Sequence, residues 1–237
     1  LADSRSYRTF CRLGMADKVP TKSSLNANLK ALQPATLEAV NRVLVGAAQE
    51  AKVETGRTVR ADCTVVESNI HEPMDSELLW DCVRVLTRLL GQARDVLGAT
   101  KVVFGNRTRR AKRRRKEIFN AKKVEDRQRA YRDLLAVTAE VCGHGLAVRE
   151  LLRDAEVLKG LSLWEDLVVK GVANDLDRVL PLTQRVMDQT RRRVLEGQSV
   201  PAGEKIVSIF EEHTDIIRKD NRETIYGHKI CLTGGAS

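Results

Sequence analysis

Aromatic residues make up only 4% of this 237-residue chain, and cysteine and proline each occur five times. So few aromatic side chains leave little surface on which the bases of single-stranded nucleic acid could stack. The cysteines are scattered and form no Cys-x-x-Cys pair, which argues against a zinc site and favours free thiols in a reducing compartment. No apolar run approaches the roughly 20 residues that span a bilayer. We therefore expect a cytoplasmic protein without membrane contact.

Charge is plentiful and unevenly placed. The chain is 31% charged and carries 41 basic against 32 acidic residues, and a single ten-residue segment at 107–116 holds eight of the basic residues and no acidic one. The rest of the chain is therefore about neutral. A run of this density favours a polyanion, because neutralised phosphates release condensed counterions. The alternative is a solvated face with no dedicated partner. The predicted DNA-binding residues are Arg107, Arg109, Arg110, Lys112, Arg113, Arg114, Arg115 and Lys116.

Hydrophobic periodicity predicts a chain rich in helix. Apolar residues recur at helical spacing over about 34–53, 75–97, 124–158 and 163–195. Pro181 should kink or split the last of these segments. Asp75 or Ser76 should cap the second segment. That segment carries a heptad-like stripe for packing on other helices, formed by Leu79, Val83, Leu86, Leu90, Ala93 and Leu97.

Residues 58–71 instead predict a buried β-strand, since β-branched residues are dense and apolar residues alternate. In its middle lies Asp62. Burying a carboxylate costs several kcal/mol unless it is paired or holds a cation, so this residue is a candidate functional acid. Two more short strands are expected near the end of the chain, over about 205–210 and 226–232.

Three separated blocks resemble one family. The segment DCTVVESNIH at residues 62–71, followed by DSELLWD at 75–81, resembles the first catalytic segment of DDE-type transposases from bacterial insertion sequences. EKIVSIFEEHT at 204–214 and YGHK at 226–229 resemble the second and third strands of the same family. The blocks occur in the family's order and span nearly the whole chain.

The resemblance implies a mostly α fold with a small β-sheet, in which a partial RNase H-like α/β core is interrupted by a large all-helical insertion. Residues 1–56 would be the end of an N-terminal helical domain, and 57–70 the first strand of the core. Residues 71–203 would form the helical insertion that carries the basic segment 107–116. Residues 204–237 would supply the second and third strands.

The resemblance also implies a chemistry. Such enzymes cut and rejoin the DNA ends of a mobile element with two divalent metals, Mg²⁺ or Mn²⁺, held by three carboxylates. Asp62 matches the first of the three acids, both as a catalytic residue and as a metal ligand. The second and third acids lie beyond the segment matching 226–232, so we expect a fragment that is inactive by itself. DNA, and a second copy of the chain on DNA, are the implied partners in the bacterial cytoplasm.

Two other functions remain open from the residues. One is a non-catalytic DNA-binding helical protein, which would dock the basic run on the duplex backbone without reading its sequence. The other is a helical scaffold protein, whose heptad-like stripes would pair with a partner chain.

Overall fold

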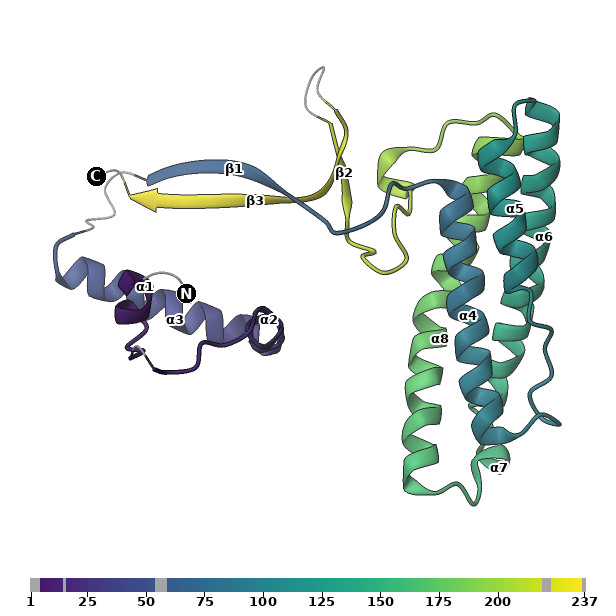
Figure 1. Cartoon of the computed structure of the whole chain (residues 1–237), viewed down its shortest axis with the longest axis horizontal. Helices are drawn as coiled ribbons and strands as arrows, with labels where there is room; N and C mark the ends of the chain where they lie inside the picture. Colours follow the sequence, from purple (N-terminus) through teal and green to yellow (C-terminus); the bar gives the residue numbers. More distant parts are fainter. Residues whose placement is uncertain (1–4, 15, 54–58, 219–222, 236–237) are drawn as a thin grey trace. The chain divides into compact units, whose positions relative to one another are not determined.

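The structure is a computed structural model, and it describes residues 5–14, 16–53, 59–218 and 223–235. It is mostly helical with one small sheet, which confirms the coarse prediction. The chain divides into two compact units, Leu1–Asp62 with Cys231–Ser237, and Cys63–Ile230. The division crosses two strands, β1 (Val59–Glu67) and β3 (Ile225–Gly235), which are drawn in Figure 1.

The first unit contains three helices with no buried residues: α1 (Arg5–Phe10), α2 (Lys22–Ala31) and α3 (Pro34–Glu50). Thr21 caps α2 by accepting a 3.1 Å hydrogen bond from the Ser24 N–H. Pro34 opens α3, where its missing N–H costs nothing. α3 ends at Glu50, about three residues before the predicted end at 53, and the predicted domain boundary at residues 56–57 falls outside the described residues.

The second unit is built on a bundle of α4 (Asp75–Leu97), α5 (Thr108–Asn120), α6 (Val124–Leu151) and α8 (Leu163–Thr190), which lie side by side in Figure 1. A short helix, α7 (Ala155–Leu158), connects α6 to α8. All six residues of the predicted heptad-like stripe on α4 are buried, as expected. The helical bundle is thus held together by its own apolar core.

Three details of the helices differ from the prediction. The segment 124–158 breaks into α6 and α7, because the Asp154 side chain accepts the Glu156 N–H at 2.9 Å and starts a new helix. Pro181 does not split α8, which runs through it and continues as a π-helical turn at Arg191–Leu195. Pro181 is exposed, so water can satisfy the carbonyl that the ring leaves without a donor. Asp75 is not a cap, since Met74 holds that position without a side-chain bond.

The sheet has three strands in the order β1-β3-β2, with β2 at Asp215–Ile217. β2 and β3 are antiparallel, with Ile216 opposite Tyr226. Gly227 lies where β3 approaches β1 closely: a Cβ at this position would lie 2.1 Å from the Val66 carbonyl oxygen. Only glycine therefore fits there without moving backbone.

The strand expected at 205–210 is wrong. This segment is irregular, and Ile206, Val207 and Ile209 are buried. Side chains satisfy its backbone in place of a neighbouring strand. The Gln189 amide accepts the Ile206 N–H at 2.8 Å and donates to the Ile206 carbonyl at 3.1 Å. The Ser208 hydroxyl accepts the N–H groups of the second and third residues after it, at 3.1 and 3.2 Å.

Candidate nucleic-acid interface

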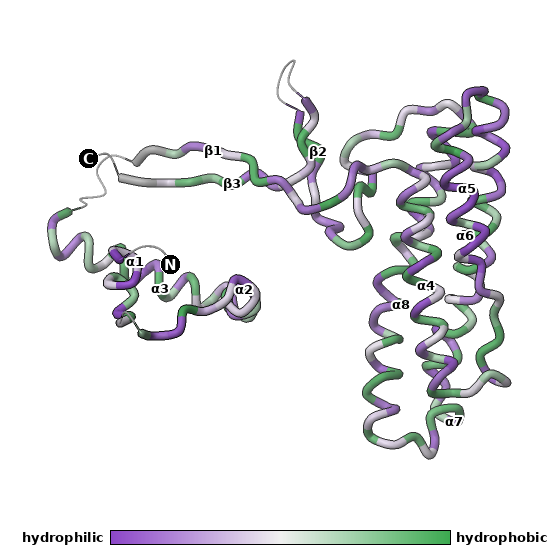
Figure 2. Tube along the Cα trace, viewed as in Figure 1, coloured by the Kyte–Doolittle hydropathy of each residue, from purple (hydrophilic) through white to green (hydrophobic). Residues whose placement is uncertain are grey.

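The basic segment is an ordered helix, α5. Asn106 starts it by accepting the Thr108 N–H at 3.0 Å. Ala111 and Ile118, seven residues apart, are buried and anchor one side of the helix on the core. Figure 2 shows that the remainder of α5 is strongly hydrophilic. Packing on two small apolar anchors thus presents the cations at fixed angles around the helix axis.

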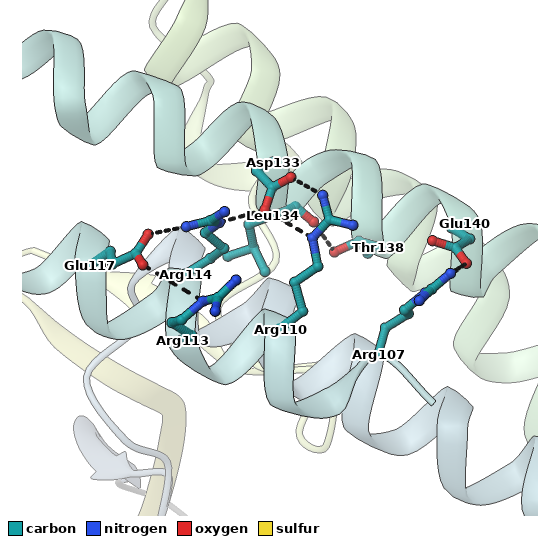
Figure 3. A network of polar contacts seen from close by, with 9 residues as sticks. All are labelled: Arg107, Arg110, Arg113, Arg114, Glu117, Asp133, Leu134, Thr138 and Glu140. Atoms are coloured by element: carbon teal, nitrogen blue, oxygen red, sulfur yellow. Dashed lines mark hydrogen bonds and ion pairs between the residues drawn. The ribbon is translucent and has the colours of Figure 1, made fainter. Parts of the chain in front are cut away.

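One set of these cations faces carboxylates on neighbouring helices (Figure 3). Arg107 donates to Glu140 on α6 at 2.8 Å, and Arg110 and Arg114 both donate to Asp133 on α6. Arg114 also pairs with Glu117 of its own helix at 2.5 Å. Arg115 pairs with Glu77 on α4 at 2.5 Å. We call Arg107, Arg110, Arg114 and Arg115 the inner set.

The other set points away from the bundle. It contains Arg109, Lys112, Arg113 and Lys116, all exposed, which we call the outer stripe. Their spacing of three, one and three residues places them on one helix face, opposite Ala111 and Ile118. In the described part of the chain, the outer stripe has one weak ion pair, with the Arg113 Nε 3.8 Å from Glu117.

Asp133 is the electrostatic centre of the inner set. Hydrogen bonds from Arg110 and Arg114, set against partial burial, lower the pKa of its carboxyl to about 2. The same contacts raise the pKa of both guanidinium groups. Asp133 therefore remains ionised in the folded chain well below the ordinary pKa of an aspartate.

This shift predicts acid sensitivity. A carboxyl whose folded pKa lies near 2, against an ordinary 3.8, stabilises the folded state above pH 4, and that stabilisation disappears as pH falls through 2. The free energy of unfolding of Asp133→Asn should therefore lie below that of the wild type at pH 7. The two values should converge near pH 2. Urea unfolding across this range measures the effect, with Asp126→Asn on the same helix as the control; parallel pH curves for wild type and Asp133→Asn would contradict it.

The sequence contains a spacing that matches the ion pairs of the inner set. Arg107 and Arg114 are seven residues apart, and so are their partners Asp133 and Glu140. Equal spacing on two antiparallel helices brings both pairs into register at once. Without knowing that α5 and α6 are neighbours, the basic residues alone could not be divided into two sets. Their role in binding DNA stays a prediction.

Asp62 lies in β1, as predicted, but the expectation that it is buried is wrong. The residue is exposed, as are Ala61, Cys63 and Thr64. These four consecutive residues alternate between the two faces of the strand, so neither face is covered at this point among the described residues. Among the described residues, no three His, Cys, Asp or Glu side chains form a group that could hold a metal ion. One exposed carboxylate does not fit the two-metal site that the resemblance implies.

Comparisons with protein families, with curated proteins and with solved structures give no match to this chain. The described helices include none with the length and apolar character needed to cross a bilayer. The arrangement of charge around α5 is therefore the strongest guide to function.

Proposed function

We propose that the helical unit binds the phosphate backbone of DNA through the outer stripe of α5. The observation that carries this proposal is the division of the basic segment: one set of cations is paired within the fold, and the other is exposed on a single face. With a rise of 1.5 Å per residue, Arg109 to Lys116 spans about 10 Å. That length matches roughly three phosphates along one DNA strand.

The composition of the stripe supports a polyanion over an ordinary solvated face. Arg109 and Arg113, and Lys112 and Lys116, are like charges four residues apart, an arrangement that destabilises a helix. A solvated surface usually mixes both signs. The only carboxylate on α5 is Glu117, which the inner set already engages. A bound row of phosphates would relieve the repulsion.

The packing of α4 weighs against the scaffold alternative. Its heptad-like stripe is the apolar surface that would pair with a partner chain, yet Leu79, Val83, Leu86 and Leu90 are each 0% exposed within the bundle. The protein's own helices bury this stripe. It offers no free seam for a coiled coil.

The proposal is tested by comparing alanine variants of the two sets. Each outer-stripe substitution, such as Lys112→Ala or Lys116→Ala, should weaken duplex binding for every sequence alike and reduce the salt slope by about one. Arg110→Ala should instead lower the melting temperature and leave the salt slope unchanged. Fluorescence anisotropy with two unrelated duplexes measures both. Equal slope changes from the two sets would overturn the division of roles.

A second candidate is the transposase activity that the sequence resemblance implies. The arrangement that favours it is the adjacency of β1, which carries Asp62, to β3, which carries the third matching block. Strand transfer in the presence of Mg²⁺ that Asp62→Asn abolishes would support this activity. Activity that survives the substitution would remove Asp62 from the reaction.

A further inference from the structure

A second cationic site lies away from α5. A pocket of about 350 Å³ opens between the start of α4, the end of α8, the irregular segment after α8 and the β2–β3 hairpin, all within the second unit. Three cations line it, Arg193, Lys205 and Arg218, against a single carboxylate, Asp75. These residues come from four separate parts of the sequence, so the fold itself assembles the positive charge.

The carboxylate in this pocket is already engaged. Asp75 is buried, and its two oxygens accept hydrogen bonds from the Arg193 Nη1 at 3.1 and 3.0 Å. Gln189 donates a further bond to Asp75 at 3.1 Å. Within the described residues, Lys205 and Arg218 form no ion pair. The pocket therefore keeps two uncompensated positive charges beside a fixed guanidinium.

Two elements hold the free cations in place. Lys205 immediately precedes Ile206, whose backbone N–H and carbonyl are both bonded by Gln189. Arg218 directly follows β2, whose pairing with β3 places Ile216 opposite Tyr226. Alternation along these strands puts Arg218, Thr224 and Tyr226 on one face of the hairpin, and all three line the pocket.

Tyr226 adds a neutral donor. Burial and the nearby Glu72 carboxylate raise the pKa of its phenol, while Arg193 lowers it, so the hydroxyl stays protonated at neutral pH. A protonated phenol, the Thr224 hydroxyl, an ammonium group and guanidinium groups are all hydrogen-bond donors. Donors of this kind around a small concave site suit a tetrahedral oxyanion, which accepts several charge-assisted bonds at once.

We propose that this pocket binds a phosphate group, with Lys205 and Arg218 as its principal ligands and Arg193, oriented by Asp75, completing the site. Two sources share this chemistry: a free phosphate and a phosphate of a nucleic-acid backbone. The proposal does not rest on the outer stripe of α5, because the two sites share no residue.

The test uses the whole chain and two probes, inorganic phosphate followed by calorimetry at constant ionic strength, and a duplex oligonucleotide followed by anisotropy. Lys205→Ala with Arg218→Ala should lower affinity for the bound probe tenfold or more, because two charged hydrogen-bond donors are removed. Lys101→Ala, which removes an exposed cation elsewhere, should leave affinity within twofold. If the alanine pair lowers the melting temperature, Lys205→Gln with Arg218→Gln, which keeps long polar side chains, replaces it.

The outcomes separate the two sources. Loss of inorganic phosphate binding supports a site for free phosphate. Loss confined to the duplex, and persisting when the outer stripe has been replaced by alanine, supports a backbone phosphate. Unchanged affinity for both probes would overturn the proposal, while the outer-stripe variants would still report independently on DNA binding by α5.

Discussion

Reversing two charges on the outer stripe, with Lys112→Glu and Lys116→Glu, is expected to weaken duplex DNA binding by at least about a hundredfold at low salt. Each reversal removes one counterion-releasing contact and adds repulsion from the same phosphate. Both side chains are exposed and have no ion pair in the described part of the chain, so the helical fold should be unaffected. Anisotropy titrations at 50 mM salt measure the loss, and far-UV circular dichroism checks the fold.

The matched control changes net charge by the same amount elsewhere. Lys101→Glu with Arg191→Glu reverses two exposed cations outside α5. This pair should weaken binding much less than the outer-stripe pair, because neither residue belongs to the stripe. Equal losses from the two double variants would mean that net charge, and not the stripe, governs binding.

The largest expected effect on stability is at Asp75, at the first position of α4. Its carboxylate is 6% exposed and holds both Arg193 and Gln189. Asp75→Ala leaves these donors without their acceptor, and breaking a buried charged pair costs about 3–5 kcal/mol. Because Arg193 is partly exposed and can recover water, we expect about 3 kcal/mol. Urea unfolding of the whole chain measures the change in the free energy of unfolding.

Asp166→Ala provides the comparison for this prediction. Asp166 pairs with Lys170 at 2.7 Å on the exposed side of α8, and such surface pairs contribute about 0–1 kcal/mol. Asp75→Asn should fall between the two variants, since an amide oxygen can still accept from Arg193. If Asp75→Ala and Asp166→Ala have equal effects, the network at the start of α4 does not hold the helix end in place.

The helices of the bundle were predictable because their signals are local. Periodic leucines and valines located the limits of α4 to the residue, since a strong apolar period is bounded there by Pro73 on one side and Gly98 on the other. The basic run was equally visible. Which of its basic residues form ion pairs within the fold could not be predicted from the segment itself, because their partners Asp133 and Glu140 lie on another helix.

The strand expected at 226–232 is confirmed within β3, but the strand expected at 205–210 failed, because its conformation depends on contacts with other segments. Ile206, Val207 and Ile209 are β-branched residues that favour a strand, but tertiary packing buries them while Gln189 satisfies the backbone. Whether a β-branched run pairs with another strand depends on which segments lie next to it in the fold, and local sequence patterns do not reveal these.

The exposure of Asp62 could not be predicted, since nothing in residues 58–71 says whether another element will cover either face of the strand. The phosphate pocket was missed because its cations are scattered: Arg193, Lys205 and Arg218 stand in three different segments of the sequence. Only the pairing of β2 with β3 and the Gln189 clamp on Ile206 bring them together. Sequence reasoning finds charge that is concentrated along the chain more readily than charge that folding concentrates.

The most direct test of the division of α5 into inner and outer cations is the salt dependence of duplex binding by the wild-type chain. Four outward cations predict a slope of log K against log salt of about −3.6, equivalent to a loss of roughly a hundredfold between 50 and 200 mM. A slope near zero would mean that this helix makes no phosphate contacts with DNA, and would contradict the proposed function. A slope near −7 in a chain that also carries Lys205→Ala and Arg218→Ala would require the inner set to reach phosphate as well, and would contradict the ion pairs that hold it to α4 and α6.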